Sequence, residues 1–242
     1  GDLIVAIDGQ RVDARGVGTL LVGAADTVVE VTLRRGGTDR RVAVIPTASE
    51  TPLRYQAWVA SRIAYVDEKS DGRLGYLHVP DMMAQGWAQF HRGLDLAMSH
   101  EGLVADMRYN GGGHTSQLII ERLGRKIVGW DVVRHGSPEP YPSAGRRGPV
   151  VFVTNQFAGS DGDIVCAAAQ ELELGPVVGQ RSWGGVIGID GRFDLVDGTS
   201  VTQPRYSFHF DTLGWDVENH GVDPDVEVAI PEGELTVIVG PN

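Results

Sequence analysis

A serine in a glycine-rich turn is the residue of this sequence best placed for covalent chemistry. Residues 150–153 form a continuous apolar run that predicts a buried strand, and an Ala-rich segment ending near Leu172 predicts a helix. Between them lies the turn Gly159-Ser160-Asp161-Gly162-Asp163. A serine at such a turn exposes its hydroxyl beside N–H groups of the helix N-terminus, which suit a developing oxyanion. The competing interpretation, which the local sequence favours, makes Ser160 only the N-cap, with Asp163 at a capping-box-like spacing.

A second glycine-rich turn precedes this one. Asn110-Gly111-Gly112-Gly113 directly follows a predicted strand at 103–107. Glycines there allow a ligand to approach the backbone closely and leave N–H groups to point at an anion, although a flexible turn would also explain them. If both turns follow parallel strands, they lie on one rim of the sheet, where ligands of open α/β sheets bind. The pair of turns is therefore more informative than either one alone.

Alternating strands and helices must position these turns. Strands are predicted at 74–79, 103–107, 126–133, 150–153 and 176–179, with helices at 52–66, 84–99, 115–123 and from Ser160 to about Leu172. This alternation predicts a largely parallel sheet with helices on its faces. From Val186 the pattern changes to β-hairpins with turns at Asp190-Gly191 and Asp197-Gly198.

Composition limits the classes of partner. The 242 residues carry a net charge of −11, which argues against nucleic acid or an anionic membrane as partner. The one cysteine, Cys166, excludes an internal disulfide and indicates packing on its helix. No zinc spacing, calcium loop or phosphate loop is present, so no metal or cofactor is expected. The chain opens without methionine inside a predicted strand, which predicts a fragment of a longer protein.

Two stretches near the start, "GDLIVAIDGQRV" and "VVEVTLRRGG", resemble the later two thirds of a PDZ domain over residues 1–45. A PDZ domain binds extended peptide by adding it to a sheet edge. In this chain the carboxylate-binding loop of that family would lie upstream of Gly1. The piece could therefore bind peptide or only pack against its neighbour.

Five further stretches, "GYLHVPDM", "DMRYNGGG", "VTNQFAGSDGD", "VVGQRSWGG" and "DVENHGVDPDVEV", occur in an order that resembles the catalytic part of the tricorn core proteases. These are related to the carboxyl-terminal processing peptidases. The resemblance implies a partial PDZ-like module over residues 1–46 and a crotonase-like α/β catalytic domain over residues 47–242.

The same resemblance implies roles for individual residues. Ser160 would be the nucleophile, and the backbone N–H groups of Gly113 and Asp161 would form the oxyanion hole. Asp131 would lie in the pocket for the residue on the acyl side of the cleaved bond, where a carboxylate favours Lys or Arg. Glu218 would belong to the family's charge-orienting chain of Glu, Ser and His. The competing interpretations are a solvated strand end for Asp131 and a surface carboxylate for Glu218.

The general base is the missing part of this mechanism. The processing peptidases use a lysine about 25 residues after the serine, but Gly185 occupies that place and no lysine follows Lys126. A Ser–Lys mechanism with a downstream lysine is therefore excluded, and the base must be histidine. In tricorn proteases this histidine comes from a segment before the PDZ domain. His114 and His220 are the plausible internal substitutes, and each is expected to be a neighbour of the site rather than the base.

The residues and this resemblance together predict a serine endopeptidase or oligopeptidase that cleaves unfolded oligopeptides through an acyl-enzyme, with the fragment alone inactive. The resemblance further implies a cytoplasmic homo-oligomer, a hexamer, processing peptides released by the proteasome. The alternative is a catalytically inactive module that holds peptides through the PDZ piece and the cleft.

Overall fold

The computed structural model describes residues 1–229, so the last part of the predicted catalytic domain, residues 230–242, lies outside the described residues. The chain forms two compact units, the first Gly1–Trp58 and the second beginning at Val59. The predicted domain boundary, after residue 46, falls between the last strand of the first unit and the helix that follows it. Each unit is described by itself.

The first unit is a four-stranded sheet with the order β2-β1-β3-β4. Its elements are β1 (Leu3–Ile7), β2 (Gln10–Arg11), α1 (Val17–Leu20), β3 (Val29–Arg35) and β4 (Thr38–Val44). All the pairings are antiparallel, and Ile7, Val29 and Val31 form its small core. Two hairpins, β1–β2 and β3–β4, make up most of this sheet. They agree with the PDZ-like module that the sequence predicted.

The second unit is built on a five-stranded parallel sheet with the order β13-β10-β9-β6-β5. Its strands are β5 (Leu74–His78), β6 (Gly102–Asp106), β9 (Val150–Thr154), β10 (Val177–Gly179) and β13 (Val226–Glu227). The helices between them are α3 (Ala84–Met98), α4 (Ser116–Gly124) and α5 (Asp161–Glu171). This architecture confirms the predicted α/β fold with a mostly parallel sheet.

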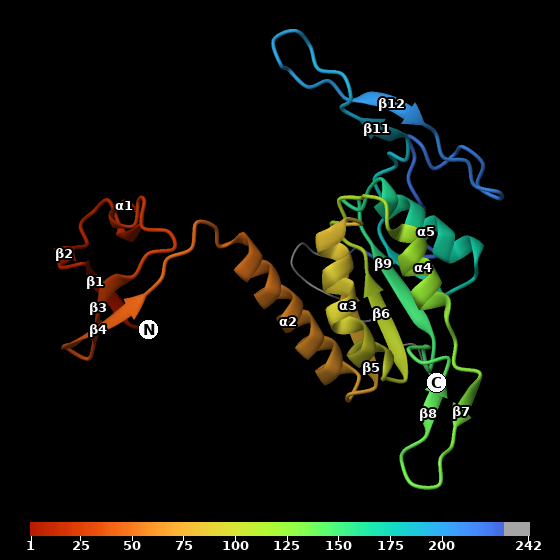
Figure 1. Ribbon diagram of the computed structural model, residues 1–242, viewed down its shortest axis with the longest axis horizontal. Helices are drawn as coiled ribbons and strands as arrows, with labels where there is room; N and C mark the ends of the chain where they lie inside the picture. Colours follow the sequence, from red (N-terminus) through yellow and green to blue (C-terminus); the bar gives the residue numbers. More distant parts are fainter. Residues whose placement is uncertain (230–242) are drawn as a thin grey trace. The chain divides into compact units, whose positions relative to one another are not determined.

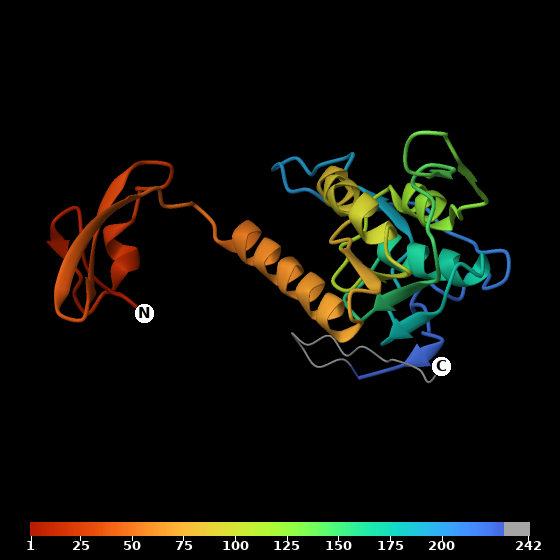
Figure 2. The same cartoon turned by 90° about the horizontal axis from the view of Figure 1, so that it is seen from below.

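Helices cover both faces of this sheet (Figures 1 and 2). Alternate strand residues such as Leu77, Ala105 and Phe152 pack with α3, α4 and α5 in the main core. The residues between them, including Tyr76 and Val104, pack under Val66 of α2 (Thr51–Lys69). The nearly continuous apolar strands follow from burial on both faces. No helix within residues 1–229 has the length and apolar character needed to cross a membrane.

Two ribbons outside the sheet differ from prediction. The segment predicted as a strand at 126–133 contributes only β7 (Gly129–Asp131), which pairs with β8 (Glu139–Tyr141) rather than with the sheet. In the other ribbon, β11 (Gly188–Asp190) pairs with β12 (Gln203–Tyr206), so Asp190-Gly191 closes no hairpin. The turn at Asp197-Gly198 is present, with an antiparallel bridge between Asp194 and Ser200. The two ribbons project from opposite ends of the unit (Figure 1).

Candidate active site

Ser160 lies between β9 and α5 in a backbone conformation that few residues adopt. Its φ of 58° and ψ of −120° are unusual for a residue with a side chain, and they cost on the order of 1–3 kcal/mol. Ser160 occupies the N-cap position, yet its hydroxyl makes no capping hydrogen bond. The N–H groups of Asp163 and Ile164 bond instead to the carbonyl oxygen of Ser160, at 2.9 and 3.1 Å. The Ser160 side chain therefore does not cap α5, contrary to the capping interpretation.

Two backbone N–H groups near Ser160 have no acceptor among the described residues. They belong to Gly113 and Asp161. Gly113 forms a parallel bridge with Met82. The hydrogen bonds of this bridge are made by its neighbours: the Gly112 carbonyl accepts from the Met82 N–H, and the His114 N–H donates to the Met82 carbonyl. The N–H of Gly113 itself takes no part in them. Asp161 is the first residue of α5, where N–H groups lack partners within the helix. Both residues line one cavity with Ser160, as oxyanion donors would.

Gly112 lets the glycine-rich loop contact the serine directly. A Cβ at Gly112 would lie 2.5 Å from the Ser160 Cβ and 3.0 Å from its Oγ. The φ of Gly112, 79°, is also one that glycine adopts without strain. Only glycine fits at this position. The two turns thus meet at the carboxyl ends of the neighbouring strands β6 and β9, as predicted for one rim of the sheet.

Two buried asparagines hold the turns together. The Asn110 side chain donates to the Val79 carbonyl at 2.8 Å and accepts from the Gly112 N–H at 2.9 Å. Its backbone carbonyl accepts from the Gly159 N–H at 2.9 Å, which joins the two turns directly. Asn155 Oδ1 accepts from the N–H groups of Tyr109 and Phe157, at 3.1 and 3.2 Å. Sequence reasoning missed Asn155, which precedes the serine turn.

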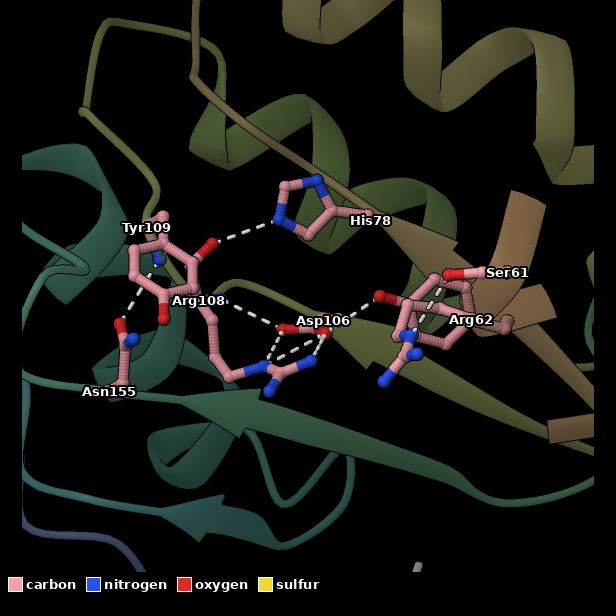
Figure 3. Close-up of polar contacts among 8 residues, drawn as sticks. Ser61, Arg62, His78, Asp106, Arg108, Tyr109 and Asn155 are labelled. Carbon is pink, nitrogen blue, oxygen red and sulfur yellow. Dashed lines mark hydrogen bonds and ion pairs between the residues drawn. The ribbon is translucent and has the colours of Figure 1, made fainter. Parts of the chain in front are cut away.

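A buried ion pair anchors the start of the glycine-rich loop (Figure 3). Arg108 Nη2 lies 2.5 Å from Asp106 Oδ2, and both side chains are almost completely buried. The Tyr76 hydroxyl donates to the same carboxylate at 2.8 Å. Burial, together with the Asp106 charge, raises the pKa of Tyr76 well above its ordinary value, so the hydroxyl keeps its proton.

His78 lies beside this pair, and its Nε2–H donates to the Arg108 carbonyl at 2.9 Å (Figure 3). Burial lowers the pKa of His78, so the ring is neutral near pH 7.

The Asp161 side chain ties the two candidate oxyanion donors together. Its Oδ2 accepts from the Ser116 N–H at 2.9 Å, and its Oδ1 accepts from the Ser116 hydroxyl. Ser116 begins α4 three residues after Gly113, so the carboxylate of α5 caps the N-terminus of α4. A carboxylate is favourable at that position because it faces the positive end of the helix dipole. The relative position of the Gly113 and Asp161 amides is fixed by this contact.

Asp163 connects the serine turn to the segment that contains Glu218. Its carboxylate accepts from the Ser182 hydroxyl at 2.5 Å and from the Gly184 N–H at 2.9 Å. The Ser182 hydroxyl in turn accepts from the Val222 N–H at 2.8 Å. Burial raises the pKa of Asp163, and these hydrogen bonds oppose the shift.

Glu218 is a half-buried carboxylate held by backbone groups. Its Oε2 accepts from the N–H groups of Val186 and Ile187, at 2.7 and 2.9 Å, while Oε1 makes no hydrogen bond with the described residues. Glu218 does not line the cavity beside Ser160, but Val186 does. One oxygen is thus fixed and the other is available to a partner.

The cavity beside Ser160 has a volume of about 590 Å³. It lies between α4, α5 and the base of the β11–β12 ribbon, with apolar walls from Ile120, Ile164, Val186, Tyr206 and Phe208. Its volume falls within the range of about 300–1,000 Å³ that is typical of ligand pockets. No three His, Cys, Asp or Glu side chains of residues 1–229 are grouped in a way that could hold a metal ion.

Asp131 lies away from this cavity. It is exposed on the β7–β8 ribbon, directly opposite Glu139, and lines neither of the hollows that contain Ser160. That ribbon projects from the end of the unit opposite to β11–β12, whose base forms the cavity wall (Figure 1). The structure of this chain therefore brings Ser160, Gly113 and Asp161 together without Asp131.

The two histidines singled out in the sequence occupy different places. His114 is exposed and lines the cavity with Ser160, but its ring makes no hydrogen bond to Ser160. His220 lines another hollow and pairs with Asp223 at 2.8 Å. Within residues 1–229, no side chain is hydrogen-bonded to the Ser160 hydroxyl as a general base would be. The Cys166 thiol is no alternative nucleophile, because burial raises its pKa to about 12.

Comparison with known proteins identifies the class. Residues 73–228 match the model of peptidase family S41, and residues 1–49 match the model of the tricorn protease PDZ domain. The chain belongs to peptidase family S41.

Within this family, the chain is similar to tricorn proteases in particular. Tricorn protease homolog 1 of Streptomyces coelicolor is 62% identical over 94% of this chain and 22% of its own length. Tricorn protease of Thermoplasma acidophilum is 44% identical over 94% of this chain and 22% of its own length. A crystal structure of the tricorn protease matches with a TM-score of 0.90 and 43% identity, over 95% of this chain and 23% of that one. The chain thus spans between a fifth and about a quarter of these relatives' length.

Proposed function

We propose that the full-length protein containing this chain is a serine peptidase that cleaves unfolded oligopeptides through an acyl-enzyme. The observation that carries the proposal is the strained Ser160 with an uncommitted hydroxyl, in one cavity with the two uncommitted N–H groups of Gly113 and Asp161. In an acyl-transfer reaction, the serine oxygen attacks the peptide carbonyl, and the two amides stabilise the negative oxygen that forms. Each such donor is worth about 2.7–4 kcal/mol of barrier.

The general base in this proposal is a histidine supplied by residues outside this chain. A serine hydroxyl needs such a base near neutrality. Glu218, with one oxygen fixed by two amides, would orient that histidine and stabilise its positive charge, directly or through an intervening group. Neither internal candidate, His114 or His220, is hydrogen-bonded to Ser160. The isolated 242-residue chain is therefore expected to be inactive.

Labelling with a fluorophosphonate tests the nucleophile and the missing base together. The full-length protein should form a covalent adduct that mass spectrometry locates at Ser160, and the adduct should vanish in Ser160→Ala. The isolated chain should label at least about 10³-fold more slowly, because losing a catalytic base costs on that order or more. A full-length protein without adduct would favour the alternative, an inactive module that binds peptides. Fast labelling of the isolated chain, lost in His114→Ala, would place the base inside it.

Although Asp131 lies outside both hollows that contain Ser160, it is proposed, on the resemblance alone, to favour Lys or Arg on the acyl side of the cleaved bond. It forms no ion pair with the described residues, so its charge is available to a substrate. In the full-length protein, Asp131→Asn should reduce the preference for Lys over Leu by about ten- to a hundredfold in kcat/KM, since a hydrogen bond to a charged group is worth about 1.5–3 kcal/mol. Glu139→Gln, which neutralises the carboxylate directly opposite, is the matched control and should leave the preference unchanged. An unchanged preference in Asp131→Asn would remove Asp131 from substrate recognition.

The same resemblance supports wider proposals for the full-length protein: a cytoplasmic hexamer that degrades peptides released by the proteasome, with no cofactor. Peptides are the expected partners, and the net charge of −11 disfavours nucleic acid and anionic membranes.

A further inference from the structure

Ser160 lies between two hollows rather than beside one. In addition to the large cavity, a second hollow of about 240 Å³ has Ser160 in its lining, together with Asn110, Gly111, Gln156, Phe157, Gly159 and Trp183. Ser160 is the one residue that the two linings share. The second hollow is smaller than the roughly 300–1,000 Å³ of a small-molecule pocket, so it suits a single side chain. We call it the Phe157–Trp183 hollow.

The Trp183 ring is held in place although the residue is 66% exposed. A Cβ at Gly159 would lie 2.7 Å from the ring atom Cε3, and one at Gly185 would lie 2.3 Å from Cζ3. The ring thus rests against two positions where any side chain would displace it, one of them next to Ser160. The Trp183 N–H also donates to the Ala158 carbonyl at 2.9 Å. These contacts position an aromatic surface without burying it.

The opposite wall is built in the same way. Phe157 is 55% exposed, and its ring stacks on Tyr109, with centroids 5.5 Å apart and planes 12° from parallel. The buried Asn155 holds both residues by their N–H groups. Each Å² of apolar surface that stays in water loses about 25 cal/mol of the stabilisation that burial would give. Exposed apolar patches of this kind mark binding surfaces.

We propose that the Phe157–Trp183 hollow binds an aromatic or large aliphatic side chain of the peptide substrate. The large cavity would hold the side chain of one of the two residues at the cleaved bond. The Phe157–Trp183 hollow would hold the side chain of the residue on the other side of that bond. This inference rests on the proposed function: the carbonyl carbon under attack must lie at the Ser160 hydroxyl, and the peptide leaves that atom in two directions. Each direction leads to one hollow. The lining carries no charged side chain, so a charged residue would lose hydration without gaining a partner.

Cleavage of a peptide library by the full-length protein tests this, with both residues flanking the cleaved bond varied and the products mapped by mass spectrometry. Wild type should prefer Phe or Leu over Ala at the flank that the Phe157–Trp183 hollow binds. Trp183→Ala should lower this preference about ten- to a hundredfold at one flank, which is the range expected for losing most of the burial of one large side chain. Trp183→Phe should recover most of it. Tyr206→Ala, in the wall of the large cavity, should alter selection at the other flank.

Trp215→Ala is the matched control, because Trp215 is 57% exposed and lines neither hollow. It should leave selection at both flanks unchanged. If Trp183→Ala cleaves with wild-type selection, or changes the same flank as Tyr206→Ala, the inference is overturned while the peptidase stands. If wild type shows no cleavage that depends on Ser160, the proposed function itself fails and this inference fails with it.

Discussion

Replacing Gly112 with alanine should slow fluorophosphonate labelling of Ser160 in the full-length protein by at least about a hundredfold. The added Cβ would lie 2.5 Å from the Ser160 Cβ, and both atoms are fixed by their backbones, so the two turns must separate. Both backbone groups of Gly112 are also hydrogen-bonded: its N–H donates to Asn110 Oδ1, and its carbonyl accepts from the Met82 N–H. These bonds restrain the loop from moving away from Ser160. A displacement of about 1 Å between reacting groups costs about 10²-fold in rate.

Gly198→Ala is the control for this prediction. Gly198 has nearly the same φ, 80° against 79°, but nothing lies within 4 Å of its added Cβ, and it belongs to neither hollow that contains Ser160. This variant carries the strain of a side chain in the left-handed region without the collision. It should label at the wild-type rate. Thermal unfolding of both variants separates loss of fold from displacement of the nucleophile, and normal labelling of a folded Gly112→Ala protein would contradict the close contact between the two turns.

The sequence predicted those parts of the site that depend on local chemistry. Apolar runs of four to six residues located the central strands, and the two glycine-rich turns were expected at the same rim because parallel strands place their carboxyl ends together. The structure places them there. What the pattern could not show was how the turns are joined. The bond from Gly159 to the Asn110 carbonyl, and the shared acceptor Asn155, depend on pairing between segments some fifty residues apart.

The ribbons show a second limit. Residues 126–133 have an apolar composition typical of a sheet strand, yet β7 pairs with β8 outside the sheet. Local propensity does not choose a partner strand. Residues 134–148, which contain β8, are rich in proline and glycine and show no strand pattern. Asp131 lies on that ribbon, outside both hollows that contain Ser160. The short strand β13 was also not predicted, because two residues are too few to show the apolar pattern of a strand.

The Asp106–Arg108 ion pair connects the parallel sheet to the glycine-rich loop of the candidate site. Asp106 ends β6, and Arg108 begins the loop that leads to Gly113, so one ion pair sets the direction in which the loop leaves the sheet. The sequence "DMRYNGGG" therefore combines an anchor and a site: the charged residues hold the loop, and the glycines present its N–H groups. An arginine suits this anchor because its planar fork bonds both carboxylate oxygens at once: Nε donates to Oδ1 at 2.9 Å and Nη2 donates to Oδ2 at 2.5 Å.

Removing this anchor should have the largest effect on stability. In Arg108→Met, the Asp106 carboxylate loses its cation while it remains fully buried, and breaking a buried pair in this way costs about 3–5 kcal/mol. We expect urea unfolding at pH 7 to show that loss as a lower midpoint. The matched control is Arg125→Met, which breaks the exposed pair with Glu121 on α4 and should cost less than about 1 kcal/mol.

The two variants remove the same charge and keep a side chain of similar length, so their difference compares a buried ion pair with an exposed one. A loss below about 1 kcal/mol in Arg108→Met would mean that water reaches Asp106 once the arginine is gone. Tyr76→Phe provides a third measurement, since it removes only the hydroxyl that donates to the same carboxylate. It should cost about 1–3 kcal/mol, as expected for losing one hydrogen bond to a buried charge. The order Arg108→Met, Tyr76→Phe, Arg125→Met in decreasing cost would show that the buried carboxylate, rather than the number of ion pairs, anchors the loop that carries Gly113.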